Sequence, residues 1–273
     1  MKLCLITDDV AFAVEAEQAG IDRILLDLER DGKAERQAGR NLFLSNHRIE
    51  SVARLKRTLR KTPIVVRINP LSARSHIEID TVADAGADFI MLPYFSGLPE
   101  VRAFLKMVRS RAGVILLVET KSAAGQIEAL VTEPGVDEVH IGLNDLSISL
   151  GQDSIFEPLC AGMIEEMASV LRDARVPFGF GGIARLSLQG LPVHPEHMLA
   201  EQVRLGASRG WLSRTFRGGM ERSRDPGELA REVMALRRAV KKWQSAPPWA
   251  LLQVHAALSR EVACDRLRYR RMR

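Results

Sequence analysis

The stretch 114–151, VILLVETKSAAGQIEALVTEPGVDEVHIGLNDLSISLG, contains two short apolar runs that each lead to an acid. The first run ends at Glu119, and the second, 139–141, leads within a few residues to Asp145. The separation of the two acids is about the length of one strand–helix unit. The pattern therefore predicts two successive strands, each followed by a helix, with an acid at the carboxyl end of each strand.

The same pattern recurs along most of the chain. Short runs rich in Val, Ile and Leu, apolar on both faces as in a buried parallel sheet, predict eight strands. Between them, segments such as 51–61 and 101–111 place apolar residues on one helical face. Eight alternations predict one closed (β/α)8 barrel, a TIM barrel, rather than two domains. The predicted strands are 3–7, 23–29, 64–69, 89–93, 114–120, 138–142, 178–183 and 211–216.

Two segments are not explained by the alternation of strands and helices in a barrel. The connection 30–47, which follows the second strand, is longer than a usual strand-to-helix loop. SAPP, 245–248, breaks the chain, and the amphipathic sequence WALLQVHAALSREV follows it. We therefore predict a barrel domain over 1–243 and a C-terminal helical extension with a basic tail over 244–273.

Composition excludes several classes of protein. Hydrophobic residues make up 46% of the 273 residues, which is ample for a core, and no apolar run is long enough to span a membrane. The net charge of +5 comes from the tail RLRYRRMR, which has five arginines and no acid, so a basic nucleic-acid-binding face is not predicted. The start MKLCLITDD does not have the pattern of a signal peptide, and Cys4, Cys160 and Cys264 are far apart. A reduced, cytoplasmic setting is expected.

Active sites of parallel barrels lie at the carboxyl ends of the strands. Asp27, Glu29, Arg67, Glu119 and Asp145 are polar residues at such ends. Two carboxylates on adjacent strands suit one hard cation such as Mg²⁺, which leaves its other positions to water and substrate. A nearby arginine could bind a substrate carboxylate or an enolate oxygen. The alternative is that each acid caps a helix or pairs with Arg67, and Asp145 in particular could cap the helix LSISLG.

Four segments also carry a resemblance to a known family: VRIN (66–69), MLPYFSGLPEVRAF (91–104), LLVETKSAAGQIEAL (116–130) and IGLNDLSISLG (141–151). From about residue 20 to 220 the chain resembles the HpcH/HpaI aldolase and citrate lyase β-subunit family. Its members are metal-dependent enzymes on a (β/α)8 barrel, and they make or break carbon–carbon bonds next to an enolate. The resemblance is most specific at ET, 119–120, followed by the second acid segment.

The resemblance implies roles for particular residues. Glu119 and Asp145 would hold the metal, with Mg²⁺ expected and Mn²⁺ or Co²⁺ as alternatives. Arg67 would stabilise the enolate. The backbone amides of Leu143, Asn144 and Asp145, at a helix start, would receive the substrate carboxylate. The segment DLER, 27–30, corresponds to an acid-rich motif of the family, so Asp27 and Glu29 would support these residues.

One position departs from the family pattern. The pyruvate aldolases of the family have a histidine acid–base where this chain has Arg30, and the citryl- and malyl-CoA branch has an acid there. His47, at the end of the long loop, is the nearest spare imidazole and is predicted as the catalytic acid–base. The alternative is that His47 is an exposed residue without a catalytic role, near the start of the following helix. His140, within the sixth strand, is predicted to be a hydrogen-bonded core histidine.

These observations predict a metal-dependent aldolase that forms or cleaves an adduct of a 2-oxo acid, such as pyruvate, with an aldehyde. A CoA-thioester lyase and a catalytically inactive barrel that serves as a binding subunit are the alternatives. The resemblance and the apolar C-terminal helix also suggest a homo-oligomer. The aldehyde, the direction of reaction, the metal and the oligomer number stay open.

Overall fold

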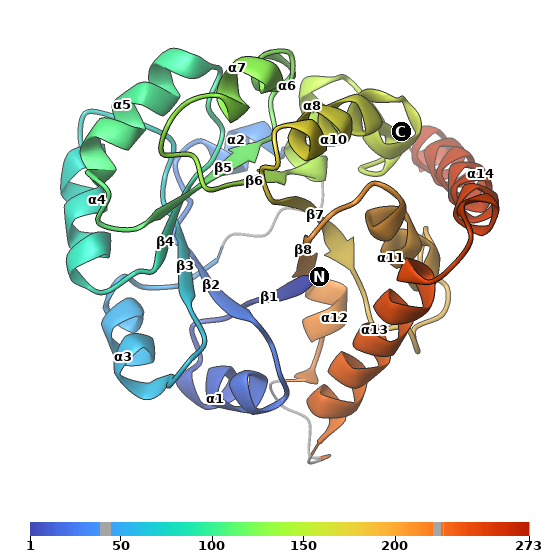
Figure 1. Ribbon diagram of the computed structural model, residues 1–273, viewed down its shortest axis with the longest axis horizontal. Coiled ribbons are helices and arrows are strands. Elements are labelled where there is room, and N and C mark those ends of the chain that lie inside the picture. Colours follow the sequence, from blue (N-terminus) through green and yellow to red (C-terminus); the bar gives the residue numbers. More distant parts are fainter. Residues whose placement is uncertain (39–44, 221–224, 226, 273) are drawn as a thin grey trace.

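The chain folds into a closed barrel of parallel strands surrounded by helices, as Figure 1 shows. The computed structural model describes residues 1–38, 45–220, 225 and 227–272, with the backbone alone for 269–272. Each strand pairs in parallel with the next, and the last pairs with the first. The predicted (β/α)8 fold is thus confirmed. The strands are β1 (Lys2–Ile6), β2 (Arg23–Asp27), β3 (Ile64–Arg67), β4 (Phe89–Leu92), β5 (Gly113–Val118), β6 (Glu138–Ile141), β7 (Phe178–Ile183) and β8 (Arg209–Leu212).

The strands are apolar on both faces because each face meets its own core. One buried cluster fills the barrel interior and includes Leu25, Val65 and Ile115. The larger cluster lies between the strands and the helices, where residues such as Leu26 and Val66 pack. Alternate residues of one strand therefore enter different cores, as in other parallel barrels.

Helices follow the strands around the barrel. The principal helices are α1 (Val10–Gln18), α3 (Glu50–Thr58), α4 (Ser75–Asp84), α5 (Leu98–Val108), α10 (Met163–Asp173), α11 (Pro195–Arg204) and α13 (Glu228–Gln244). Shorter helices are α6 (Lys121–Ala124), α7 (Ile127–Val131), α8 (Leu143–Ser149), α9 (Glu157–Cys160) and α12 (Arg214–Arg217).

Several strands end earlier than predicted because helix caps follow them. The eighth strand was predicted over 211–216, but β8 ends at Leu212. The Ser213 hydroxyl accepts a hydrogen bond from the Phe216 backbone N–H at 3.1 Å, which starts α12. Thr120 acts in the same way after β5, accepting from Ala123 N–H at 3.1 Å. Such caps satisfy backbone donors that the first helical turn leaves free.

The long connection after β2 contains an element that the sequence did not predict. α2 (Lys33–Arg36) is one helical turn, and it begins after Gly32, whose φ is 68°. A φ in this left-handed region favours glycine. The later part of the connection, 39–44, lies outside the described residues.

The C-terminal helix is fixed to the barrel by buried and polar contacts. Leu258 and Val262 of α14 (Pro248–Met272) are buried, and α14 lies beside α11 (Figure 1). Glu261 of α14 accepts a hydrogen bond from the His194 backbone N–H at 3.0 Å. Among the helices described, none has the length and apolar character needed to cross a membrane. The division of the chain at residue 243 stays a prediction.

A buried ion cluster closes the barrel at the amino ends of the strands. The Arg23 guanidinium of β2 donates two hydrogen bonds, each of 2.6 Å, to the Glu138 carboxylate of β6. Arg209 of β8 also pairs with Glu138, at 3.0 Å. Burial alone would raise the pKa of Glu138, but these two arginines lower it. The cluster thus joins three strands across the interior and keeps the carboxylate ionised.

Candidate active site

Four of the predicted site residues lie at or just beyond the carboxyl ends of the strands. Asp27 ends β2 and is in register with Arg67, which ends β3. Glu119 directly follows β5, and Asp145 lies in the first turn of α8, just beyond β6. Because parallel strands all end at the same mouth of the barrel, these side chains are brought to one place.

Arg67 is held by a bidentate ion pair. Its Nε and Nη2 donate to Asp27 Oδ1 and Oδ2 at 2.8 and 2.5 Å, and its Nη1 lies 3.5 Å from Glu29 Oε2. Burial by itself would raise the pKa of Asp27, but Arg67 and Lys33 outweigh it and hold that pKa well below its usual range. Asp27 is therefore a fixed anion, and its two oxygens set the plane of the guanidinium.

Glu119 is a buried acid with few cationic partners. Its Oε1 accepts a hydrogen bond from the Tyr94 backbone N–H at 3.0 Å. Tyr94 has a φ of 45°, a conformation that is uncommon for a residue with a side chain. Burial, together with the negative charges of Glu29 and Asp145, raises the pKa of Glu119 well above its ordinary value. The carboxyl group thus lies where a further positive charge would be favourable.

Asp145 does not cap α8, and it is not the principal partner of Arg67. The N-cap of α8 is Gly142, which makes no side-chain cap hydrogen bond, and Arg67 pairs with Asp27 and Glu29. Asp145 Oδ2 instead accepts a hydrogen bond from Gln37 Nε2 at 2.7 Å. Its Oδ1 is buried and has no hydrogen-bond partner among the described residues.

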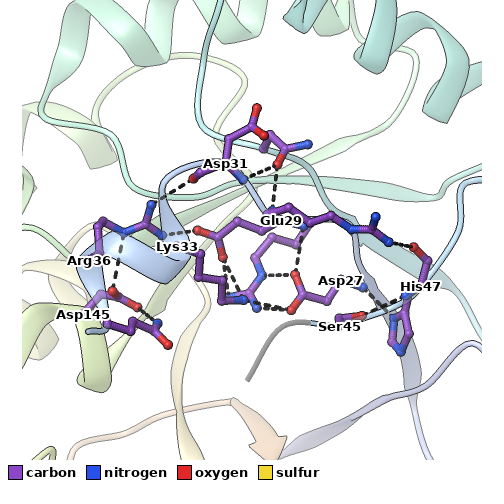
Figure 2. Close-up of polar contacts among 12 residues, drawn as sticks. Asp27, Glu29, Asp31, Lys33, Arg36, Ser45, His47 and Asp145 are labelled. Atoms are coloured by element: carbon purple, nitrogen blue, oxygen red, sulfur yellow. Dashed lines mark hydrogen bonds and ion pairs between the residues drawn. The ribbon is translucent and has the colours of Figure 1, made fainter. Parts of the chain in front are cut away.

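The structure adds three residues that sequence reasoning missed: Lys33 and Arg36, which are labelled in Figure 2, and Gln37. Lys33 Nζ lies 3.1 Å from Asp27 Oδ2 and 3.2 Å from Glu29 Oε2. Lys33 and Arg36 are three residues apart, which places both on one side of a helical turn. That spacing, directly after the acidic segment DLER, was the available signal.

His47 is buried, so the alternative of an exposed residue is wrong. Its Nδ1 accepts a hydrogen bond from the Asp27 backbone N–H at 3.0 Å, and its Nε2 lies 3.6 Å from Asp8 Oδ1. Figure 2 shows His47 and Asp145 at opposite sides of the polar cluster, with Asp27 and Glu29 between them. Arg30, at the position where this chain departs from the family pattern, donates a hydrogen bond to the His47 backbone carbonyl at 3.1 Å.

His140 is a core residue, as predicted, but its ring is not fully hydrogen-bonded. It is buried in the barrel and stacks on Trp211, with ring centroids 3.7 Å apart. Its Nε2 is buried and lacks a hydrogen-bond partner within the described part of the chain. Burial, with a contribution from the Arg67 charge, lowers the pKa of His140 well below its ordinary value. The ring is therefore neutral near pH 7.

The donor set at the mouth suits a hard divalent cation with two protein ligands. Glu119 and Asp145 supply carboxylate oxygens, which Mg²⁺ prefers, and Asp145 Oδ1 is a buried acceptor without a hydrogen bond. Within 1–38, 45–220 and 227–272 no group of three or more His, Cys, Asp or Glu side chains is arranged to hold a metal. Mg²⁺ commonly leaves its other coordination positions to water and substrate.

Comparison with known proteins agrees with this fold. The chain is structurally similar to an HpcH/HpaI aldolase from Desulfitobacterium hafniense DCB-2, with a TM-score of 0.57 and 16% identity over 90% of this chain and 93% of that chain. It is also similar to RipC from Yersinia pestis, with a TM-score of 0.55 and 17% identity over 86% of this chain and 94% of that chain. At such identities the similarity concerns the fold.

The comparison of sequences is more specific about the family. Functionally curated proteins provide no match to this chain. The family model described as HpcH/HpaI aldolase/citrate lyase matches residues 3–158, which is more than half of the sequence. The chain therefore belongs to the HpcH/HpaI aldolase/citrate lyase family.

Proposed function

We propose that this protein is a metal-dependent aldolase that forms or cleaves an adduct of a pyruvate-type 2-oxo acid with an aldehyde. Family membership implies a carbon–carbon lyase or aldolase. The observation that carries the finer proposal is the meeting of Glu119, Asp145 and Arg67 at the barrel mouth.

Glu119 and Asp145 are the proposed ligands of the metal, Mg²⁺ first and Mn²⁺ or Co²⁺ as alternatives. When bound, a divalent cation would polarise the keto group of the 2-oxo acid and make its methyl protons more acidic. The two carboxylates are suited to this because burial and their mutual repulsion favour a positive charge between them. Gly142 leaves the space that Glu119 occupies.

Arg67 is proposed to stabilise the enolate oxygen. Its guanidinium is already oriented by Asp27 and charge-paired with Glu29, so little reorganisation is needed when negative charge develops. Asp27 and Glu29 thus serve as supports for Arg67. The backbone N–H groups of Leu143, Asn144 and Asp145, in the first turn of α8, are proposed to receive the substrate carboxylate.

Proton transfer is assigned to His47. Its Nδ1 accepts the Asp27 N–H, so the exchangeable proton of the neutral ring is on Nε2, which faces Asp8. Proton transfer through His47 therefore has to use Nε2. We also expect a homo-oligomer in the reducing cytoplasm, where the unpaired Cys4, Cys160 and Cys264 would stay thiols.

Exchange of the pyruvate methyl protons for deuterium tests enolate formation without knowledge of the aldehyde. The protein is incubated in D₂O with Mg²⁺ or with EDTA, and the methyl signal is followed by NMR. We expect Mg²⁺-dependent exchange that falls at least ~100-fold in Glu119→Gln and in Asp145→Asn, because both lose a metal-ligand charge. Glu133→Gln, which changes a carboxylate paired with the surface residue Arg102, is the matched control.

The outcomes separate the alternatives. Exchange that survives both substitutions would overturn the assigned metal ligands. No exchange of pyruvate, but Mg²⁺-dependent exchange of acetyl-CoA protons, would indicate a thioester lyase. No exchange of either compound would favour a barrel that binds without catalysis.

A further inference from the structure

Arg36 lies between two acids of the site. Its Nη2 is 2.5 Å from Glu29 Oε1, and its Nε is 3.6 Å from Asp145 Oδ1. Its guanidinium carbon lies 3.9 Å from the centroid of the Tyr94 ring. Gln37, the next residue, donates to Asp145 Oδ2. Figure 2 shows Arg36 beside Asp145, where its guanidinium is next to Oδ1 but makes no hydrogen bond to it. The other oxygen, Oδ2, is occupied by Gln37.

These contacts are largely buried from solvent, and charges interact strongly in such surroundings. The exposed fraction of the side chain is 11% for Arg36, 9% for Asp145 and 1% for Glu29. At such sites a guanidinium 3.6 Å from a carboxylate oxygen repels a cation that approaches that oxygen, because two positive charges a few ångströms apart interact strongly at low dielectric. In this arrangement Asp145 Oδ1 has no hydrogen bond, but the charge of Arg36 opposes the binding of a cation to it.

The charge balance leads to the same conclusion. The described site has four carboxylates (Asp27, Glu29, Glu119 and Asp145) and three cationic side chains (Lys33, Arg36 and Arg67). Its net charge is therefore about −1 when all are ionised. A divalent cation would make the site positive with Arg36 in place, and neutral with Arg36 displaced. Uncompensated buried charge is costly, so the neutral arrangement is favoured.

We propose that Arg36 competes with the divalent metal for Asp145, so that α2 leaves Asp145 when the metal binds. This inference rests on the metal site of the proposed function. In the metal-free protein α2 then occupies the acids. When the metal binds, α2 leaves Asp145 and the mouth of the barrel becomes accessible. Lys33 remains with Asp27 and Glu29 and is not part of the competition.

The affinity for Mn²⁺ tests the competition directly, with the free ion measured by electron paramagnetic resonance. If about nine molecules in ten have Arg36 on Asp145, its removal tightens binding about tenfold. We therefore expect Arg36→Gln to bind Mn²⁺ about tenfold more tightly than the wild type. Arg30→Gln is the matched control, because Arg30 is in the same connection but donates to the His47 carbonyl. Gln37→Ala, which retains every charge, should tighten binding several-fold.

Trypsin provides a readout of α2 itself. The bond after Arg36 is protected while its side chain is buried on Glu29 and Asp145, and it should be cut faster when Mn²⁺ is added. The bond after Lys33, which stays on Asp27 and Glu29, should be cut at an unchanged rate. Mass spectrometry assigns the cleavage sites. Slower cleavage with Mn²⁺ would overturn the inference, because α2 would then be held more tightly by the metal.

The failure of the inference is distinguishable from that of the proposed function. Equal Mn²⁺ affinity of Arg36→Gln, Gln37→Ala and wild type overturns the competition, while pyruvate exchange in the same samples still reports on the aldolase. Weaker binding by Arg36→Gln, with an unchanged circular dichroism spectrum, also overturns it. Mn²⁺ binding by none of these proteins overturns both proposals.

Discussion

Glu119 lies so close to Gly142 that a side chain at position 142 would displace it. An ideal Cβ at Gly142 would be 2.5 Å from Glu119 Oε2 and 2.8 Å from Glu119 Cβ. The φ of Gly142 is −88°, which alanine adopts without strain, so the conflict is steric alone. We expect Gly142→Ala to weaken Mn²⁺ binding about tenfold or more while the fold is kept.

The matched control for this substitution is Gly181→Ala, in β7. A Cβ there would have no heavy atom within 4 Å apart from its chain neighbours. Its Mn²⁺ affinity should equal that of the wild type. If Gly142→Ala binds Mn²⁺ with wild-type affinity and melts at the wild-type temperature, Glu119 has room to move. The position of Glu119 would then not depend on the absence of a side chain at residue 142.

The raised pKa of Glu119 makes the metal-free protein sensitive to pH. The folded protein binds the Glu119 proton more tightly than the unfolded chain does. Stability therefore falls as pH rises from the unfolded pKa, near 4.5, towards the raised folded value. At pH values above this range, we expect the free energy of unfolding of Glu119→Gln to exceed that of the wild type by about 1 kcal/mol or more, because the buried charge is removed.

Thermal melts in EDTA at pH 5 and pH 8 would measure this effect. The gain of Glu119→Gln over wild type should be larger at pH 8 than at pH 5, because the raised pKa keeps more of the wild-type carboxyl protonated at the lower pH. Excess Mg²⁺ should reverse the order at pH 8, since the ion stabilises only the protein that binds it. A gain that is independent of pH would contradict the raised pKa.

Sequence alone could predict the residues at the strand ends but not the partners that surround them. Glu119, Asp145 and Arg67 follow apolar runs, and runs of this kind end at the barrel mouth whatever the loops do. The contacts of Arg36 and Gln37 with Asp145 depend on how the connection after β2 folds back, which no local pattern determines. The directions of the His47 ring nitrogens are set by tertiary contacts in the same way.

At the scale of elements, the barrel strands were predictable because a buried parallel strand must be apolar on both faces. The ends of the strands were harder to predict. The fifth and eighth strands were predicted to continue to residues 120 and 216, but the structure has helix caps at Thr120 and Ser213. Helices α3 and α5 follow from the spacing of residues such as Val52, Leu55 and Phe104, all buried. α2 has one turn only, too short for any periodicity to reveal.

At the scale of the whole molecule, the ion cluster of Arg23, Glu138 and Arg209 spans the barrel from β2 to β6 and β8. Glu138→Gln leaves the buried Arg23 and the half-buried Arg209 without their anion. We expect it to lower the free energy of unfolding by about 3 kcal/mol, which is typical when a buried ion pair loses one partner. Mn²⁺ affinity at 25 °C should stay within twofold of wild type, because the cluster is at the opposite end of the strands from the site.

Thermal melts of Glu138→Gln beside Glu133→Gln would check this expectation. Glu133 pairs with Arg102, whose side chain is more than half exposed, so its loss should cost less than about 1 kcal/mol. Equal melting temperatures of the two variants would mean that the buried cluster contributes no more than a surface pair.

Trp211 gives the molecule an optical reporter of its own. Its indole lies against His140 inside the barrel, with the Arg67 guanidinium carbon 5.9 Å from its ring. An anion that settles on Arg67 changes the electric field across the indole, and the emission wavelength changes with it. In a chain whose other tryptophans, Trp243 and Trp249, are replaced by phenylalanine, the colour of the emitted light would report substrate arrival without any added label.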